Sequence, residues 1–117
     1  MIERFMYTLW YFRRLLPGDS GYQEGLETFA PPEKRKLNFR AISNEALLLS
    51  GGEFQEERIV GKQPVGAKEK FFDNDRVYIG SEDPSVGFDP VSPKANYRVT
   101  SVGKGHRITE IVMERMV

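Results

Sequence analysis

The chain has 117 residues, a length typical of one domain. It contains no cysteine and one histidine, His106, which excludes disulfides, thiolate catalysis, cysteine-ligated metals and sites built from several histidines. Lysine plus arginine equals aspartate plus glutamate at 17 each, without the basic excess of a dedicated nucleic-acid-binding domain. We therefore expect a protein without cofactor or metal.

Neither the longest uncharged run nor the amino-terminal residues indicate a membrane or secretory segment. The run from Phe5 to Phe12 is far shorter than the roughly 20 residues that a spanning helix needs. Glu3 and Arg4 do not resemble a signal peptide. The default expectation is a soluble cytoplasmic protein with no membrane partner.

The first half of the chain reads mainly as strands. Phe5–Phe12 is rich in aromatic residues and predicts a strand with two apolar faces, covered on both sides or placed at a subunit contact. An amphipathic helix through Met6, Leu9, Trp10 and Arg13 is the alternative. A turn follows at 17–21, then a weaker return strand over Tyr22–Phe29, and a half-buried strand over Lys36–Ile42. Residues 44–49 form a short helix or continue the strand.

The second half alternates long loops with clearer strands. Residues 51–70 are rich in glycine and charge and predict a long excursion, or a ragged hairpin, that adds little to the core. Arg76–Ile79 predicts a strand entered through a turn at 73–75, and 80–94 is a second loop. Strands over Ala95–Val102 and His106–Met116 flank a tight turn at 103–105 whose glycines suit positive φ. Together these elements predict a mainly β domain, a small antiparallel β-barrel or sandwich with long loops and at most one short helix.

Several patterns resemble known sites without completing them. Gly61–Lys68 has the glycine spacing of a phosphate-binding loop, but its lysine comes one residue late and no Ser or Thr follows. Asp73–Asp75 lacks the later ligands of a calcium loop and reads as a turn. His106 reads as a surface or edge residue. Glu53, Glu56 and Glu57 offer paired carboxylates for a hydrolase, although a solvated charge run explains them equally well.

The basic and aromatic clusters each allow two interpretations. Arg13-Arg14 and Lys34-Arg35-Lys36 either contact phosphates or form a salt-bridged surface, because glutamates lie close by in the sequence. The aromatic residues of the first strand are core, or they anchor a partner, since aromatic side chains dominate interface hot spots. The candidate subunit or adaptor interface is Tyr7, Trp10, Tyr11, Phe12, Arg13 and Arg14.

The order of features resembles the small head-completion, or head–tail connector, proteins of long-tailed bacteriophages, also called stopper or minor capsid proteins. An aromatic opening strand ends at a Gly/Ser/Asp turn, and the strand over Leu37–Ile42 feeds a long loop. Then follow Phe71–Gly80, the strand Tyr97–Val102 and a closing charged strand. The long 80–94 connection departs from the family pattern.

This resemblance implies a non-enzymatic β-barrel that assembles as a ring in the phage neck, between the portal–adaptor assembly and the tail. A long loop of the family projects toward the DNA channel and helps to retain packaged DNA. By position the matching segment is 51–70, whose candidate channel residues are Gly51, Gly52, Gly61, Lys62, Gly66, Lys68 and Lys70. The implied partners are portal, adaptor and tail proteins, other copies of the chain, and transiently the DNA. The alternatives are an unrelated β-barrel module that binds protein or nucleic acid and, more weakly, a carboxylate-dependent hydrolase.

Overall fold

The computed structural model describes residues 6–41 and 57–116, and all of the regular structure in these ranges is β-strand. The predicted helix or strand over 44–49 lies outside the described residues. Six strands are present: β1 (Met6–Phe12), β2 (Glu33–Ala41), β3 (Arg58–Pro64), β4 (Arg76–Tyr78), β5 (Tyr97–Lys104) and β6 (Ile108–Arg115).

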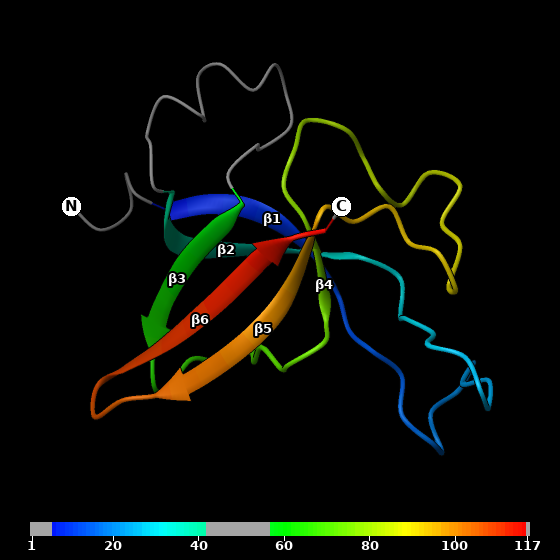
Figure 1. Ribbon diagram of the computed structural model, residues 1–117, viewed down its shortest axis with the longest axis horizontal. Coiled ribbons are helices and arrows are strands. Elements are labelled where there is room, and N and C mark those ends of the chain that lie inside the picture. The colour runs from blue at the N-terminus through cyan, green and yellow to red at the C-terminus, as the bar shows by residue number, and fades with distance from the viewer. Residues whose placement is uncertain (1–5, 42–56, 117) are drawn as a thin grey trace.

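The strands form one antiparallel sheet that closes on itself in the order β1-β2-β3-β6-β5-β4 (Figure 1). Closure comes from β4, which pairs with β1 on one side and with β5 on the other. The prediction of a mainly β domain, a small antiparallel β-barrel or sandwich, is therefore confirmed, and of these two arrangements the sheet is the closed one.

The barrel interior is filled by the side chains that alternate inward along each strand. Leu9 and Tyr11 point inward from β1, and a bulge between Val99 and Ser101 turns Val102 toward the interior beyond it. The interior cluster consists of Leu9, Tyr11, Leu37, Ile59, Phe71, Val77, Ile79, Tyr97, Val99, Ile111 and Met113.

A second apolar cluster covers the outer face of β1 and β4. Phe12 and Tyr78 are buried there together with Phe29, and Trp10, Phe88 and Ala95 pack against them. Phe29 lies in the β1–β2 connection and Phe88 in the β4–β5 connection, so these two connections supply the cover. Both faces of the first strand are thus covered within the chain, and the amphipathic-helix alternative is wrong.

The predicted return strand over Tyr22–Phe29 is wrong. The described backbone there consists of turns, and its contact with the first strand is a bridge between Arg14 and Phe29. Gly18, Gly21 and Gly25 all have positive φ, a conformation that extended strands do not contain. These glycines therefore make the connection a series of turns.

The predicted loop over 51–70 is wrong for Arg58–Pro64, which is β3 and pairs with both β2 and β6. Ile59 is fully buried in the interior cluster. A Cβ on Gly61 would lie 2.9 Å from Cγ of the buried Leu37, so the glycine that suggests a loop is required by packing. Residues 51–56 lie outside the described residues.

The expected positive φ at Gly103 and Gly105 is not observed. Strand β5 continues to Lys104, and the hairpin closes over the next three residues. Gly105 donates its N–H to the carbonyl of Ile108 at 2.8 Å, and a Cβ on Gly105 would lie 2.8 Å from that same oxygen. Close approach of the backbone, and not φ, explains this glycine.

Candidate functional site

The aromatic residues of β1 do not form an open partner surface. Tyr11 and Phe12 are buried within the chain, one in the interior cluster and the other in the outer cluster. The prediction that they belong to a subunit or adaptor interface is therefore wrong. Trp10 is half-buried, with Lys34 Nζ 5.2 Å from its ring centroid, and of Tyr7 only the backbone pairing with Leu37 is described.

The two arginines that follow β1 form ion pairs at the surface. Arg13 Nη1 lies 3.3 Å from Asp19 Oδ2, and Arg14 Nε lies 3.7 Å from Glu27 Oε2. Glu27 also pairs with Arg76 at 3.4 Å. The salt-bridged interpretation of Arg13-Arg14 is the one that the structure supports.

A buried polar network joins β1 to the start of β4. The Tyr11 hydroxyl donates to Asp75 Oδ2 and accepts a hydrogen bond of 3.0 Å from the N–H of Phe72. Asp75 Oδ1 accepts a hydrogen bond of 2.9 Å from the N–H of Arg14. Burial raises the pKa of the Asp75 carboxyl, and these two donors act against that rise. The sequence indicates a turn here but not its buried carboxylate.

Arg35 anchors the end of the β3–β4 connection. Its buried guanidinium lies 3.9 Å from the Tyr11 ring centroid, donates to the carbonyl of Lys70 at 2.6 Å, and pairs with Glu33. The Phe71 ring packs edge-on against Tyr11 with centroids 4.8 Å apart. The segment predicted as a long excursion is therefore anchored to the barrel at this end.

A hollow with a volume of about 720 Å³ opens where β3, β5, β6 and the β3–β4 connection meet. We call it the barrel mouth; its lining is Gln63, Lys70, Phe71, Phe72, Asp73, Val102, Lys104 and Thr109. Phe71, Val102 and Thr109 form its inner wall, and the two lysines flank it. No ion pair among the described residues involves either lysine. The mouth therefore combines an apolar wall with positive charge.

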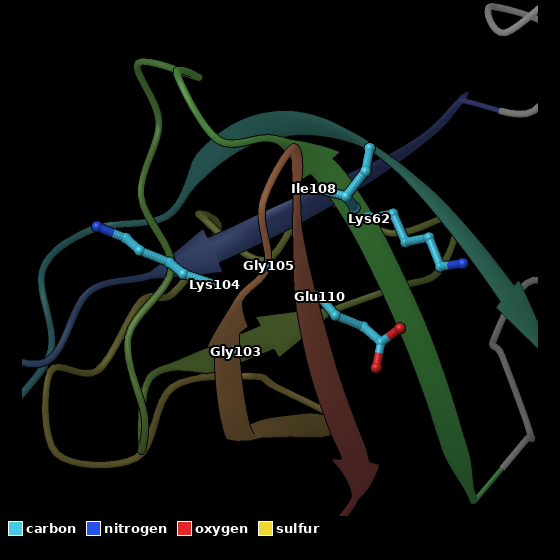
Figure 2. Close-up of a pocket in the computed structure, with 6 residues that line it drawn as sticks. All are labelled: Lys62, Gly103, Lys104, Gly105, Ile108 and Glu110. Carbon is cyan, nitrogen blue, oxygen red and sulfur yellow. The ribbon is translucent and has the colours of Figure 1, made fainter.

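A second hollow of about 390 Å³ lies against the outer face of the sheet. Lys62 and Glu110 occupy opposite positions on β3 and β6, and both point into it, whereas Lys104 points away (Figure 2). The lysine and the carboxylate offset each other, and exposed Ile108 completes the lining. The outer hollow differs from the barrel mouth in its apolar lining, which is Ile108 alone in place of Phe71, Phe72 and Val102.

The candidate channel residues do not share one loop. Gly61 and Lys62 belong to β3, and Lys70 lines the barrel mouth. Gly66 and Lys68 are exposed in the β3–β4 connection. Gly51 and Gly52 lie outside the described residues.

The remaining candidate catalytic and metal-binding residues do not form one site in the described part of the chain. Glu53 and Glu56 lie outside the described residues, and Glu57 is exposed. His106 is exposed on the β5–β6 hairpin, as predicted. The predicted turn at 73–75 is present, with Asn74 at a φ of 71°. Within 6–41 and 57–116 no group of three or more potential metal-binding side chains is found.

The two long connections carry exposed apolar side chains. Leu16 and Leu26 belong to the β1–β2 connection, and Val86 and Val91 belong to the β4–β5 connection. The connections are joined at their bases, because the N–H of Phe29 donates to the carbonyl of Pro90 at 2.9 Å. Both extend from the same side of the barrel (Figure 1).

The described part of the chain contains no helix that is long and apolar enough to span a membrane. Comparison with protein-family models, with curated proteins and with solved structures finds no match for the chain.

Proposed function

We propose that the chain is a non-enzymatic structural protein of the bacteriophage neck, of the head-completion type. In this proposal it assembles as a ring between the portal–adaptor complex and the tail, first in the host cytoplasm and then in the virion, and it helps to retain packaged DNA. Two features support it: the order of sequence elements, which resembles that family, and a closed antiparallel sheet, which is the fold that the resemblance implies.

The observation that carries this proposal is the set of exposed apolar side chains on the two connections. Leu16, Leu26, Val86 and Val91 lie outside both buried clusters. The connections that hold them are fixed to the barrel by Phe29 and Phe88 of the outer cluster. Exposed apolar side chains that gather on one side of a molecule can form a surface that another protein covers. The connections are therefore the proposed contacts with other protein chains, which include adaptor or tail proteins and further copies of this chain.

The charges of the β3–β4 connection fit occasional contact with DNA. Lys68 and Lys70 flank Glu69, and Asp73 follows shortly after. The lysines attract phosphate, and the neighbouring carboxylates weaken that attraction. Such a mixed surface allows DNA to slide past without being held.

The test is binding of the purified chain to the portal–adaptor complex encoded beside its gene, measured as a mass shift by sedimentation. Neighbouring genes for portal, capsid and tail proteins are the first expected finding. We expect Leu16→Asp combined with Leu26→Asp to weaken binding by about tenfold or more, because a carboxylate without a partner is costly to bury in an apolar contact. Ile108→Asp, on an exposed residue of the hairpin, is the control and should bind normally. Failure of the unmodified chain to bind its cognate complex contradicts the proposal.

A nucleic-acid-binding module is the second candidate, and the barrel mouth is the observation that favours it. Phe72 is exposed beside Lys70 and Lys104, and an aromatic ring beside cations can stack a base near its phosphate. This candidate predicts affinity of the isolated chain for single-stranded DNA that falls steeply with salt. Fluorescence anisotropy with a labelled oligonucleotide separates it from the neck proposal.

A further inference from the structure

A turn over residues 83–88 of the β4–β5 connection holds Val86 in solvent. Asp83 Oδ1 accepts hydrogen bonds from the N–H of Ser85 at 2.9 Å and from its hydroxyl at 2.5 Å. The N–H groups of Val86 and Phe88 donate back to Asp83 and Ser85, and Gly87 has a φ of 68°. Val86 is 80% exposed, more than the other large exposed apolar side chains described. We call residues 83–88 the Val86 turn.

The Val86 turn is fixed to the barrel on either side of the exposed valine. Pro84 is buried, and the Phe88 ring stacks on buried Phe12 with centroids 6.1 Å apart. Further along the connection, the carbonyl of Pro90 accepts the hydrogen bond from Phe29. The exposure of Val86 is therefore imposed by anchored backbone. An apolar side chain held in this way can bind a partner with little loss of conformational entropy.

The barrel mouth is a hollow with an apolar wall that can receive such a side chain. It has a volume of about 720 Å³, and Phe71, Phe72 and Val102 line it. The mouth is bounded by the β3–β4 connection and the end of β5, which lie across the molecule from the β4–β5 connection (Figure 1). The Val86 turn and the mouth of one copy lie on different sides of the molecule, so a contact between these two surfaces joins two molecules.

Charge indicates which molecule that is. The segment 82–94 carries three carboxylates, on Glu82, Asp83 and Asp89, against one amine on Lys94. The mouth carries the reverse balance, two lysines against the carboxylate of Asp73. An acidic segment that displays an aliphatic side chain is complementary to a basic hollow with an apolar wall. A second copy of this chain supplies such a segment.

We propose that the Val86 turn of one copy docks into the barrel mouth of the next copy. This inference rests on the self-association contained in the proposed function, and it names the two surfaces. Because the surfaces are different, the contact is head-to-tail, and repetition gives a ring where the rotation closes. Lys70 and Lys104 would lie near the acidic segment, and Val86 would contact the apolar wall.

The absence of native cysteine makes disulfide trapping a direct test. Val86→Cys is mixed with isotopically labelled Asp73→Cys, which keeps the lysines and the apolar wall of the mouth, and disulfides form under mild oxidation at high protein concentration. We expect the mixed dimer to form about tenfold faster than in two control mixtures. The controls are Val91→Cys with Asp73→Cys, and Val86→Cys with Ile108→Cys. Val91 and Ile108 are both accessible, with exposed fractions of 44% and 45%.

Sedimentation of the cysteine-free chain gives a second readout. We expect a mean mass that rises with protein concentration, and weaker association in high salt or with Val86→Ser or Lys104→Glu. A monomer at every concentration, together with equal trapping in all mixtures, overturns the inference. Predominant Val86–Val86 disulfides overturn it as well, because they indicate a symmetric contact. Oligonucleotide binding that requires Lys104, without self-association, assigns the mouth to nucleic acid and also overturns it.

The two proposals fail in different experiments. Binding to the portal–adaptor complex without trapping between Val86 and the mouth leaves the neck function standing and removes this contact. Trapping without binding to that complex leaves the contact standing and removes the neck function.

Discussion

Gly61 lies on β3 where the strand passes closest to Leu37, which is fully buried in the barrel interior. The position has an ordinary φ, so the need for glycine comes from space and not from backbone conformation. A methyl group here would have to displace Leu37 from a filled core, and filled cores resist added volume.

We expect Gly61→Ala to lower the free energy of unfolding by about 1–3 kcal/mol through overpacking against Leu37. Urea denaturation followed by fluorescence measures it. Gly66→Ala is the matched control, because a Cβ at Gly66 has nothing within 4 Å and the expected change is within about 0.5 kcal/mol. Equal losses in the two variants would show that the contact with Leu37 is not the cause.

Asp75 supports a prediction on pH. Burial raises the pKa of its carboxyl above the ordinary value of 3.8, so the folded chain binds this proton more tightly than the unfolded chain does. The contribution of Asp75 to stability is therefore complete below pH 3.8 and is lost as the pH rises through the raised pKa. Asp75→Asn does not titrate and should lack this loss, at a cost of about 1–3 kcal/mol for an impaired hydrogen bond.

Urea midpoints measured across the acid and neutral range check this prediction. Asp73→Asn, on an exposed aspartate of the same turn, is the control and should keep the pH slope of the unmodified chain. An unchanged slope in Asp75→Asn would mean that Asp75 has no raised pKa.

At the scale of elements, the two long connections complete the fold as well as linking strands. Their residues Phe29, Phe88 and Ala95 cover the outer face of β1 and β4, so Phe12 is buried on that face as Tyr11 is buried in the interior. The connections are consequently part of the packed structure at their bases and exposed further out.

Phe88→Ala should release the β4–β5 connection while the barrel stays folded. The ring is half-buried against Phe12, so we expect a loss of about 2 kcal/mol, roughly half that of a fully buried phenylalanine. Limited proteolysis within 80–94 should become about tenfold faster because local opening is easier. Val91→Ala, on an exposed residue, should cleave at the unmodified rate. Global unfolding of Phe88→Ala would show instead that the connection and the barrel are one cooperative unit.

Strands in which apolar and polar residues alternate could be predicted from the sequence. A strand whose residues are chosen by close packing against a neighbour could not. Alternation of apolar and polar side chains identifies β2, β5 and β6, and aromatic density identifies β1. Strand β3 is not predicted, because Gly61 and its charged neighbours have the composition of a loop. Residues 22–29 are wrongly predicted as a strand, because their apolar residues suggest one while glycines at positive φ bend the backbone.

The candidate site was less predictable than the fold. The barrel mouth takes Gln63 from β3, Thr109 from β6 and Lys104 from β5, and these residues meet only because the sheet closes. The exposure of Val86 could not be predicted from the sequence either, because it depends on the packing of Pro84 and Phe88 on either side of it.

At the scale of the whole molecule, closure of the barrel depends on its shortest strand. β4 has three residues, and it joins β1 to β5. Asn96 extends this narrow contact: its side-chain oxygen accepts from the N–H of Ile79 and its amide donates to the carbonyl of Ile79, both at 2.9 Å. A buried side chain thus takes the place of a neighbouring strand.

Asn96→Ala should weaken this closure by leaving two backbone groups of Ile79 without partners. We expect a loss of about 1–3 kcal/mol and exchange of the β4 amides about tenfold faster, with β3 and β6 much less affected. Hydrogen–deuterium exchange by mass spectrometry measures both regions. Asn38→Ala, on a half-buried asparagine of β2, is the control; equal acceleration there would argue against a special role of Asn96.

The filled interior of the barrel determines where DNA could pass in the proposed assembly. Leu9, Tyr97, Ile111 and their neighbours fill the axis of the barrel, so the described part of the chain leaves no channel along that axis. In the proposed ring, a DNA duplex must therefore pass between copies of the chain, through a space that several copies enclose. The diameter of that passage would depend on the number of copies that surround it and on how far the connections between their strands extend inward.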